Sequence, residues 1–372
     1  MFLESMFEYS MRWSNQTNGR PPSEPALLPM AGFLRSVQTP EFAGVTFHEV
    51  QAKSVLNRVG GRSAMPFEWT INPYRGCSHA CVYCFARKTH TYLDLDAGPD
   101  FDSQLVVKVN AGQVLRAELS KASWQRHHVA MGTNTDPYQR AEGRYQLMPE
   151  IISALADSGT PFSILTKGTL LARDIPLLKE ASKQVEIGMG ISLALTDPDL
   201  AKRLEPGTPT PKARLQLISR LREAGLPCGV MAMPILPWLT DSDEALDSLL
   251  SQLAAAGATG VTAGPLHLRP GAREWFMEWL AKEHPQLVGR YRRLYSGGTY
   301  ASKDYRRWLA SRVGYFKKRH GFDGGARFIR SSQEGEASNP EGTAPASSDA
   351  APSSRNGRPD PIKTGDLQPT LF

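Results

Sequence analysis

Three of the four cysteines of this 372-residue chain lie within one short segment. Cys77, Cys81 and Cys84 have the spacing C-x3-C-x2-C, which is too close to be ascribed to chance. Disulfides are rare in reducing compartments, where neighbouring thiols more often hold a metal or an iron-sulfur cluster, or form a redox pair. We therefore expect these three residues to carry the chemistry of the protein.

The number of thiols helps to distinguish the metal sites. Structural zinc sites usually combine paired C-x2-C motifs with four protein ligands, and this chain has no second motif of that kind. A 4Fe-4S cluster fits better, because one loop can bind three of its irons and leave the fourth open. An open iron can be chelated by the amine and carboxylate of a ligand and pass an electron to it, so the motif predicts a radical initiator.

Composition excludes several other classes of protein. With 41% hydrophobic and 22% charged residues, the chain can bury a large core, which excludes a wholly disordered or fibrous protein. The longest apolar run, residues 229–239, is interrupted by prolines and is shorter than the roughly 20 residues of a membrane span. Glu4 and Glu8 interrupt the N-terminal residues, so we expect no secretory signal and predict a cytoplasmic protein without a membrane partner.

Short apolar runs alternate with segments of helical spacing between residues 67 and 284. The runs predict strands at residues 67–72, 128–134, 161–167, 185–193, 228–236 and 260–268. The spacing predicts intervening helices, among them residues 145–157, 211–224 and 242–256. Such β-α units imply a parallel α/β sheet, either a partial barrel or a doubly wound sheet. In both, the site lies at the carboxyl ends of the strands.

The cysteine segment resembles the signature of a known superfamily. C-x3-C-x-aromatic-C after a first strand is typical of radical S-adenosylmethionine (SAM) proteins, which bind a 4Fe-4S cluster and cleave SAM to a 5'-deoxyadenosyl radical. The resemblance implies a partial (β/α)6 parallel barrel of radical SAM type. It also implies that Cys77, Cys81 and Cys84 are the cluster ligands and that Tyr83 lies near the adenine of SAM.

Further stretches are similar to the spore photoproduct lyase-like branch of that superfamily. The likeness covers about residues 67–269 and includes residues 72–76, 132–139, 165–168, 190–192 and 204–206. It implies that Thr135 and Asp136 hold the amino group of SAM, that Lys167 pairs with its carboxylate, and that Ser192 bonds its ribose or carboxylate. A zwitterion bound to iron needs an acceptor for its ammonium and a cation for its carboxylate, which agrees with these residue types.

One position departs from the lyase pattern. Spore photoproduct lyases use a cysteine on the second strand as a hydrogen-atom donor, and the matching position here is Thr133. A hydroxyl does not readily donate that hydrogen, so we do not predict thymine-lesion repair by that route. Cys228 begins a predicted buried strand and is interpreted as a core residue.

The segments outside the predicted core have different compositions. We divide the chain into an N-terminal extension at residues 1–50, predicted to be partly mobile, a radical SAM core at 51–285, and a helical extension at 286–330. Residues 286–330 contain twelve Lys or Arg and two acids, with aromatic residues between them. They form either a surface that binds phosphates and stacks bases, or helices with solvated basic faces.

The C-terminal residues predict a linker and a short ligand peptide. Residues 331–367 are dominated by Ser, Ala, Pro and Gly and contain no aromatic residue, which predicts a disordered linker. Residues 368–372 resemble the Gln-x-x-Leu-Phe peptides with which bacterial repair and replication proteins dock on the DNA sliding clamp. By that resemblance, Gln368, Leu371 and Phe372 contact a clamp, and Leu371 and Phe372 fill its apolar pocket.

Together these observations predict a cytoplasmic radical SAM enzyme that abstracts a hydrogen from nucleic acid in a DNA repair-like reaction. Its expected cofactors are a 4Fe-4S cluster and SAM, and its expected partners include an electron donor such as ferredoxin or flavodoxin. Two alternatives stay open. In the first, the enzyme modifies RNA or a protein side chain. In the second, the protein is a non-catalytic, DNA-associated module that binds zinc.

Overall fold

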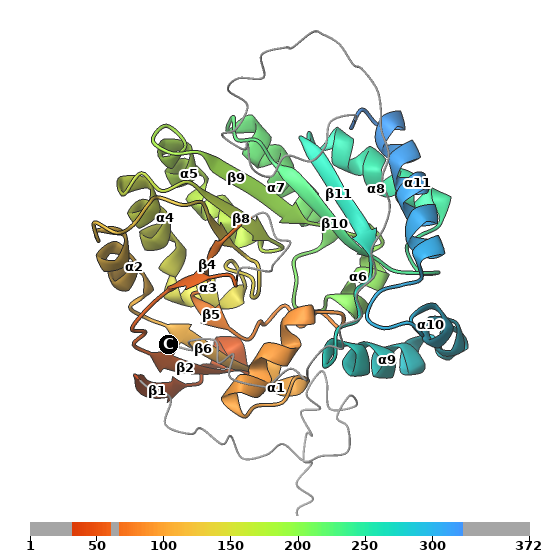
Figure 1. The fold of residues 1–372 in the computed structure, drawn as a ribbon, viewed down its shortest axis with the longest axis horizontal. Coiled ribbons are helices and arrows are strands. Elements are labelled where there is room, and N and C mark those ends of the chain that lie inside the picture. The colour runs from red at the N-terminus through yellow and green to blue at the C-terminus, as the bar shows by residue number, and fades with distance from the viewer. Residues whose placement is uncertain (1–31, 61–66, 323–372) are drawn as a thin grey trace, which may run out of the picture. The chain divides into compact units, whose positions relative to one another are not determined.

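A computed structural model describes residues 32–60 and 67–322 (Figure 1). Within them, one seven-stranded sheet has the strand order β11-β10-β9-β8-β7-β4-β3. Every neighbouring pair is parallel except β3 with β4. The strands are β3 (Leu56–Arg58), β4 (Trp69–Ile71), β7 (Val129–Met131), β8 (Phe162–Thr166), β9 (Ile187–Ser192), β10 (Gly229–Ile235) and β11 (Gly260–Pro265).

The parallel strands follow one another in space in the same order as in the sequence. A doubly wound sheet would require a reversal of strand order, and this sheet has none between β4 and β11. The fold is therefore the partial (β/α)6 barrel, and the six predicted strands are confirmed. Each strand is shorter than its predicted run, because the residues at one or both ends of the run form the loops at the sheet edges.

Helices connect the strands and flank the sheet (Figure 1). The three predicted helices are confirmed as α4 (Leu147–Asp157), α7 (Pro211–Glu223) and α8 (Asp243–Ala255). Thr210 and Ser242 cap α7 and α8 through side-chain oxygens that accept backbone N–H groups, which explains where these helices begin. The other α-helices are α1 (Pro99–Ser103), α2 (Ala111–Leu119), α3 (Arg140–Tyr145), α5 (Ile175–Ala181), α6 (Pro198–Leu204), α9 (Ala272–Glu283), α10 (Val288–Leu294) and α11 (Lys303–Arg319).

A second sheet was not anticipated from the sequence. It has the order β1-β2-β6-β5, formed by β1 (Phe33–Val37), β2 (Thr46–Val50), β6 (Gln104–Lys108) and β5 (Tyr74–Arg75). Part of the predicted N-terminal extension therefore pairs with a strand of the core, since β2 runs parallel to β6. The sheet also fixes the chain just before the cysteines, because β5 ends at Arg75.

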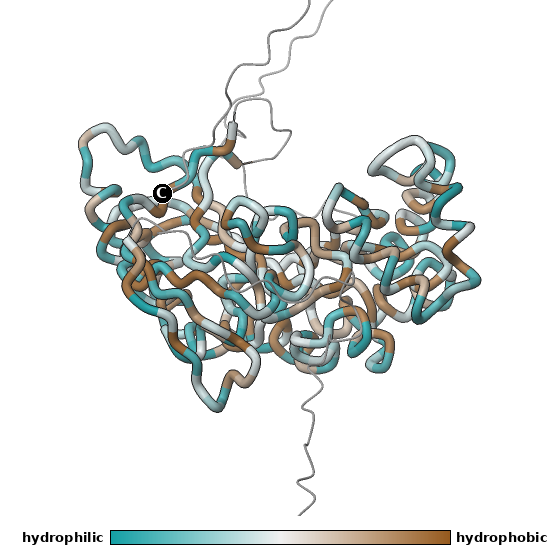
Figure 2. The backbone as a smooth tube through the Cα atoms, turned by 90° about the horizontal axis from the view of Figure 1, so that it is seen from below, coloured by the Kyte–Doolittle hydropathy of each residue, from teal (hydrophilic) through white to brown (hydrophobic). Residues whose placement is uncertain are grey.

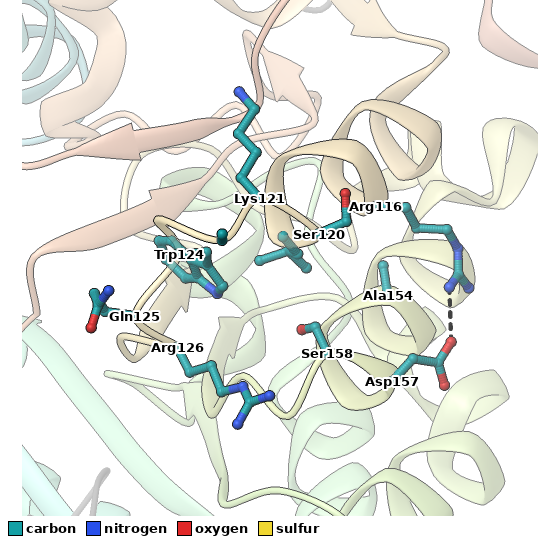
Figure 3. Close-up of a pocket in the computed structure, with 11 residues that line it drawn as sticks. Arg116, Ser120, Lys121, Trp124, Gln125, Arg126, Ala154, Asp157 and Ser158 are labelled. Atoms are coloured by element: carbon teal, nitrogen blue, oxygen red, sulfur yellow. Dashed lines mark hydrogen bonds and ion pairs between the residues drawn. The ribbon is translucent and has the colours of Figure 1, made fainter.

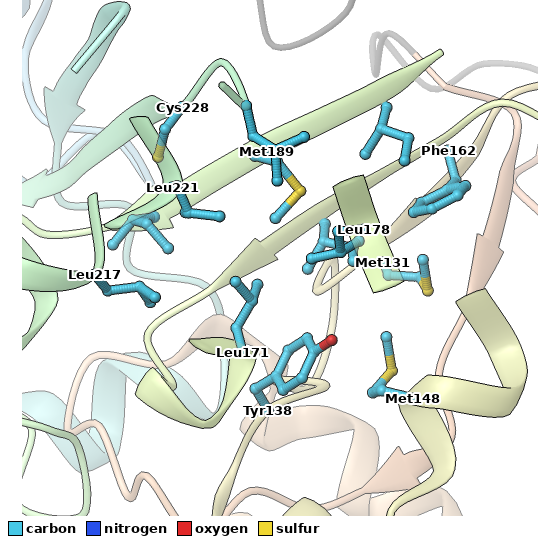
Figure 4. Close-up of a cluster of buried hydrophobic side chains, with 14 of the residues drawn as sticks. Met131, Tyr138, Met148, Phe162, Leu171, Leu178, Met189, Leu217, Leu221 and Cys228 are labelled. Carbon is cyan, nitrogen blue, oxygen red and sulfur yellow. The ribbon is translucent and has the colours of Figure 1, made fainter. Parts of the chain in front are cut away.

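Apolar and hydrophilic residues alternate along the backbone (Figure 2), and the apolar ones meet in a continuous core. Met131, Phe162, Met189 and Leu221 pack there on the inner faces of the sheet and helices (Figure 4). Cys228 is fully buried in the same cluster, which confirms its interpretation as a core residue.

The basic extension is helical as far as it is described. α10 and α11 span most of it, and α11 packs on β11 and α8. Its aromatic residues differ in exposure: Tyr300, Trp308 and Tyr315 are exposed and Tyr305 is half-buried, whereas the other described ones are buried, namely Tyr291, Tyr295, Phe316 and Phe322. The predicted linker, residues 331–367, and the predicted clamp peptide, residues 368–372, lie outside the described residues. In the described part of the chain, no helix has the length and hydrophobicity needed to cross a membrane.

Candidate active site

The cysteine segment forms a loop between β5 and a 3-10 helix at Phe85–Leu93. Cys77 and Cys81 are buried and Cys84 is half-buried, and all three are free thiols. Gly76 starts the loop at a φ of +77°, where an added Cβ would lie 2.7 Å from a side-chain methyl of Leu105. The loop therefore depends on glycine at this position.

Hydrogen bonds from distant segments hold this loop in place. The buried amide of Gln139, in the loop after β7, accepts from the Ser78 N–H at 2.8 Å and donates to the Gly76 carbonyl at 3.0 Å. The loop after α6 contributes two more bonds. The Val82 N–H donates to the Leu204 carbonyl at 3.0 Å. The Gly207 N–H donates to the His79 carbonyl, also at 3.0 Å. The cysteine positions are thus set by tertiary contacts from two strand-end loops.

The buried side chain of Arg87 also holds the cysteine loop in place. Its guanidinium is fully buried, donates to the Cys81 carbonyl at 3.1 Å, and pairs with both carboxylate oxygens of Asp102 at 2.9 and 3.0 Å. The guanidinium also lies 4.8 Å from the ring centre of Trp275. Burial raises the pKa of Asp102 to about 6 in spite of the favourable charge of Arg87. Arg87 therefore connects the cysteine loop to the core through an interaction that needs both partners.

We expect Arg87→Met to destabilise the protein strongly and to reduce its iron content. Removing one partner of a buried ion pair costs about 3–5 kcal/mol, because the other charge stays buried without compensation. Urea unfolding followed by circular dichroism measures the loss. Arg116→Met is the matched control, because Arg116 pairs with Asp157 at the surface, where such pairs contribute little. Equal unfolding midpoints for the two variants would contradict the bracing role.

Lys167, Ser192 and Tyr83, which were predicted as SAM-binding residues, lie together in the structure. Lys167 directly follows β8, and Ser192 ends β9. The Lys167 ammonium donates to Ser192 Oγ at 2.8 Å and lies 5.9 Å from the ring centre of Tyr83. The ends of β8 and β9 therefore place one cation and one hydroxyl near the aromatic ring of Tyr83 in the cysteine loop.

Glu205 connects these side chains. It is fully buried at the end of α6, accepts a hydrogen bond from the Tyr83 hydroxyl, and has an oxygen 4.0 Å from the Lys167 ammonium. The buried guanidinium of Arg214 donates to the other Glu205 oxygen at 2.6 Å and to the Ser192 carbonyl at 3.0 Å. The side chains of Tyr83, Lys167, Ser192 and Arg214 and the carboxylate of Glu205 thus form one network.

Charge in this network keeps Lys167 protonated. Burial alone would lower the pKa of Lys167, but the negative charge of Glu205 outweighs it and raises the pKa. Burial would likewise raise the pKa of Glu205, whereas the positive charges of Arg214 and Lys167 lower it. The site therefore presents a fixed ammonium, held by a carboxylate that is itself neutralised by Arg214.

Sequence reasoning missed the roles of two members of this network. Glu205 was noted only as part of a motif, and Arg214 was not noted. A signal was present, because Arg214 occupies the side of α7 that also carries the buried Leu217, Ile218 and Leu221. A charged residue on an apolar helix face indicates a buried ionic partner.

Thr135 and Asp136 also lie at this edge, but protein atoms already engage their side chains. The Thr135 hydroxyl donates to the Tyr74 carbonyl at 2.8 Å. Asp136 accepts from the Thr166 hydroxyl at 2.5 Å and from the Lys167 N–H at 2.6 Å. Asp136 is therefore a link between the ends of β7 and β8, and the assignment of both residues to the SAM amino group stays a prediction.

His79, between the first two cysteines, belongs to the same cluster. Its Nδ1 lies 3.3 Å from a carboxylate oxygen of Asp136, and both side chains are largely buried. Burial would lower the pKa of His79, but the negative charge of Asp136 raises it to about 10. The imidazolium–carboxylate pair joins the cysteine loop to the loop after β7.

Comparisons with known proteins agree with this arrangement. A family model of the radical SAM superfamily matches residues 71–250. An uncharacterized protein of Mycobacterium tuberculosis is 60% identical over 308 residues, which cover 82% of this chain and 91% of that protein. The chain belongs to the radical SAM superfamily. A second uncharacterized relative, from Methanocaldococcus jannaschii, is 30% identical over 193 residues, covering 52% of this chain and 69% of that protein.

Solved structures of spore photoproduct lyase share the fold of this radical SAM protein. One, in complex with a dinucleoside spore photoproduct, has a TM-score of 0.55 and 14% identity and covers 75% of this chain and 80% of the lyase chain. A lyase variant with bound AdoMet and the same kind of dinucleoside has a TM-score of 0.54 and 16% identity, covering 71% and 77%. This likeness shows the fold, and superfamily membership implies a 4Fe-4S cluster and SAM as cofactors.

The three thiols of this radical SAM protein suit such a cluster. Burial raises the pKa of Cys81 well above its usual value and raises the pKa of Cys84 to about 11. These thiols need a bound cation to become thiolates. In residues 32–60 and 67–322, no three His, Cys, Asp or Glu side chains converge on a single ion. A cubane does not require that convergence, because each cysteine binds a different iron.

A separate cavity of about 700 Å³ lies away from the radical SAM site (Figure 3). Trp124, Arg126 and Ser158 are among its lining residues, and an ion pair between Arg116 and Asp157 closes one side. The lining residues belong to the last turns of α2 and α4 and to the loops that lead from them to β7 and β8, so the cavity lies at the amino ends of the strands. The cysteine loop and the Lys167 network lie at the carboxyl ends.

Proposed function

We propose that this radical SAM enzyme acts on nucleic acid in a DNA repair-like reaction. In this proposal Cys77, Cys81 and Cys84 hold the 4Fe-4S cluster, and Lys167 and Ser192 bind SAM. When bound, the cluster and SAM supply the electron transfer and the radical that removes a hydrogen from the substrate. The residues of the chain bind, orient and enclose these groups.

The observation that carries the SAM assignment is the position of the Lys167 ammonium. The Lys167 side chain is 15% exposed, and its protonated ammonium donates to Ser192 Oγ near the Tyr83 ring. A carboxylate ligand that replaces the weaker neutral contact to Ser192 would gain a charge-assisted hydrogen bond from this ammonium. Glu205, paired with Arg214, keeps the ammonium in place without competing as a free anion.

Two observations support nucleic acid as the substrate class. The fold is shared with a lyase whose structures contain a dinucleoside lesion, and residues 286–322 combine exposed aromatic rings with many basic side chains. The reaction differs from the cysteine-dependent one, because Thr133 occupies the predicted donor position. Cys228 does not replace that donor, since it is fully buried at the amino end of β10, whereas the cysteine loop lies at the carboxyl edge.

The substrate class is tested by which polymer accelerates SAM cleavage. The anaerobic, reduced full-length protein is mixed with SAM and with DNA, RNA or a mixture of unstructured peptides, and 5'-deoxyadenosine is measured by mass spectrometry. We expect DNA to raise the rate and deuterium from labelled DNA to appear in the product. Acceleration by RNA or peptides alone would contradict the proposal and favour RNA or a protein side chain as substrate.

A further inference from the structure

A line of exposed side chains begins next to the cysteine loop. Phe85 directly follows Cys84, and its ring is 46% exposed. The guanidinium of Arg269, in the loop after β11, lies 5.4 Å from the centre of this ring. An exposed aromatic–guanidinium pair therefore adjoins the proposed cluster ligand at the carboxyl edge of the barrel.

The line continues from Arg269 to α11. His267, two residues before Arg269, stacks on Tyr300 with ring centres 4.1 Å apart and planes at 11°. A β-bridge joins His267 to Tyr300, so their backbones are fixed side by side. The guanidinium of Arg306 lies 5.6 Å from the Tyr300 ring centre, and its Nε donates to the Ala301 carbonyl at 3.1 Å. We call Phe85, Arg269, His267, Tyr300 and Arg306 the rim strip.

The rim strip offers unpaired positive charge beside open rings. Tyr300 is 57% exposed, and within the described residues neither Arg269 nor Arg306 forms an ion pair with a carboxylate. His267 adds no charge at neutral pH, because burial and the neighbouring Arg269 lower its pKa. The strip therefore alternates stacking surfaces with free guanidinium groups.

Other arginines of α11 are neutralised by their neighbours. Arg307 pairs with Asp304, Arg312 with Asp243, and Arg319 with Asp247. Carboxylates of α8 thus neutralise Arg312 and Arg319, and a carboxylate of α11 itself neutralises Arg307. The free guanidinium groups of the strip lie on the path that leads to the cysteine loop.

We propose that the rim strip binds a single strand of nucleic acid and directs it to the radical site. Bases stack on Phe85 and Tyr300, and Arg269 and Arg306 contact the backbone phosphates, the combination by which grooves hold single strands without reading sequence. The inference rests on the proposed function, because it assumes a nucleic-acid substrate. It adds where the strand lies and which side chains hold it.

Binding of labelled oligonucleotides to the anaerobically purified full-length protein tests the strip. Fluorescence anisotropy with fluorescein-labelled oligothymidylate and oligouridylate, over a range of salt concentrations, gives the dissociation constant and its salt slope for DNA and RNA. Loss of one stacked base predicts that Tyr300→Leu binds about 5- to 150-fold more weakly. Loss of one phosphate contact predicts that Arg306→Gln weakens binding and reduces the salt slope by about 1.

Two matched controls change residues of α11 that lie outside the rim strip. Arg307→Gln removes the same charge one residue away, where Asp304 pairs with it, and Tyr315→Leu removes a ring that is 56% exposed. Both should bind like the unaltered protein. Both controls should also retain SAM cleavage without substrate, because Arg307 and Tyr315 are exposed and do not contact the Lys167 network.

The outcomes separate the strip from the proposed function. If the unaltered protein binds neither oligonucleotide, the nucleic-acid substrate and the strip are both wrong. If it binds, but Tyr300→Leu binds as tightly as Tyr315→Leu, the strip is wrong while the proposed function stands. If Arg306→Gln and Arg307→Gln reduce the salt slope equally, binding is diffuse and the strip is again wrong.

Discussion

Cys81→Ala is expected to lose both the visible absorbance of the cluster and the reductive cleavage of SAM. Each of the three thiolates binds one iron, so the two that remain cannot hold the cubane with an open fourth corner. The iron content should fall from about four atoms per chain to a small remaining amount. Visible spectroscopy, iron analysis and detection of 5'-deoxyadenosine after reduction measure the change.

Cys228→Ala is the control for this variant. It also removes one thiol, but this thiol is fully buried in the main apolar core, outside the cysteine loop. This variant should keep its iron and its SAM cleavage and lose about 1 kcal/mol of stability, as buried substitutions commonly do. If Cys81→Ala behaved like Cys228→Ala, the assignment of the cluster ligands would be wrong.

Lys167→Met is expected to weaken SAM binding while leaving the cluster in place. The substitution keeps the length and apolar contacts of the side chain but removes the ammonium, and a hydrogen bond to a charged group contributes enough to change affinity by about 10- to 100-fold. Glu205 remains paired with Arg214, so the variant should fold. Anaerobic equilibrium dialysis with labelled SAM measures the affinity, and iron analysis confirms the cluster.

Lys183→Met provides the comparison, because the ammonium of Lys183 is exposed and pairs only with Glu180 on the surface. That variant should bind SAM like the unaltered protein. An unchanged SAM affinity of Lys167→Met with full iron content would show that another cation holds the SAM carboxylate.

The parallel sheet was predictable from local patterns, whereas the choice of a partial barrel over a doubly wound sheet came from the resemblance to radical SAM proteins. Buried parallel strands are short apolar runs, and those at residues 161–167 and 260–268 stood out because turn residues and periodic helices flank them. The cysteine spacing was visible for the same reason, since all three ligands come from one loop. Lys167 and Ser192 were proposed from the resemblance to the lyase-like branch, and their places at the carboxyl ends of neighbouring parallel strands agree with it.

Features that depend on long-range pairing were not predictable. The second sheet joins β2 to β6 across more than fifty residues, and nothing in either segment names its partner. Arg214 and Glu205 became a pair only in the fold, as did Arg87 and Asp102. Asp136 fits a SAM acceptor by residue type, yet its oxygens accept hydrogen bonds from Thr166 and Lys167.

The basic extension shows how tertiary contacts change the meaning of charge. From sequence, its lysines and arginines formed one field next to aromatic residues. In the fold, Tyr291 and Tyr295 complete the apolar core, and the carboxylates of α8 neutralise Arg312 and Arg319. Arg269 and Arg306, which form no ion pair within the described residues, lie beside exposed rings near the cysteine loop.

The most direct test of the account is chemical analysis of the anaerobically purified protein. Iron, sulfide and zinc are measured, SAM and dithionite are added, and 5'-deoxyadenosine is sought by mass spectrometry. The account predicts about four irons and four sulfides per chain, together with reductive cleavage of SAM. Zinc without sulfide, or an intact cluster that never cleaves SAM, would contradict it.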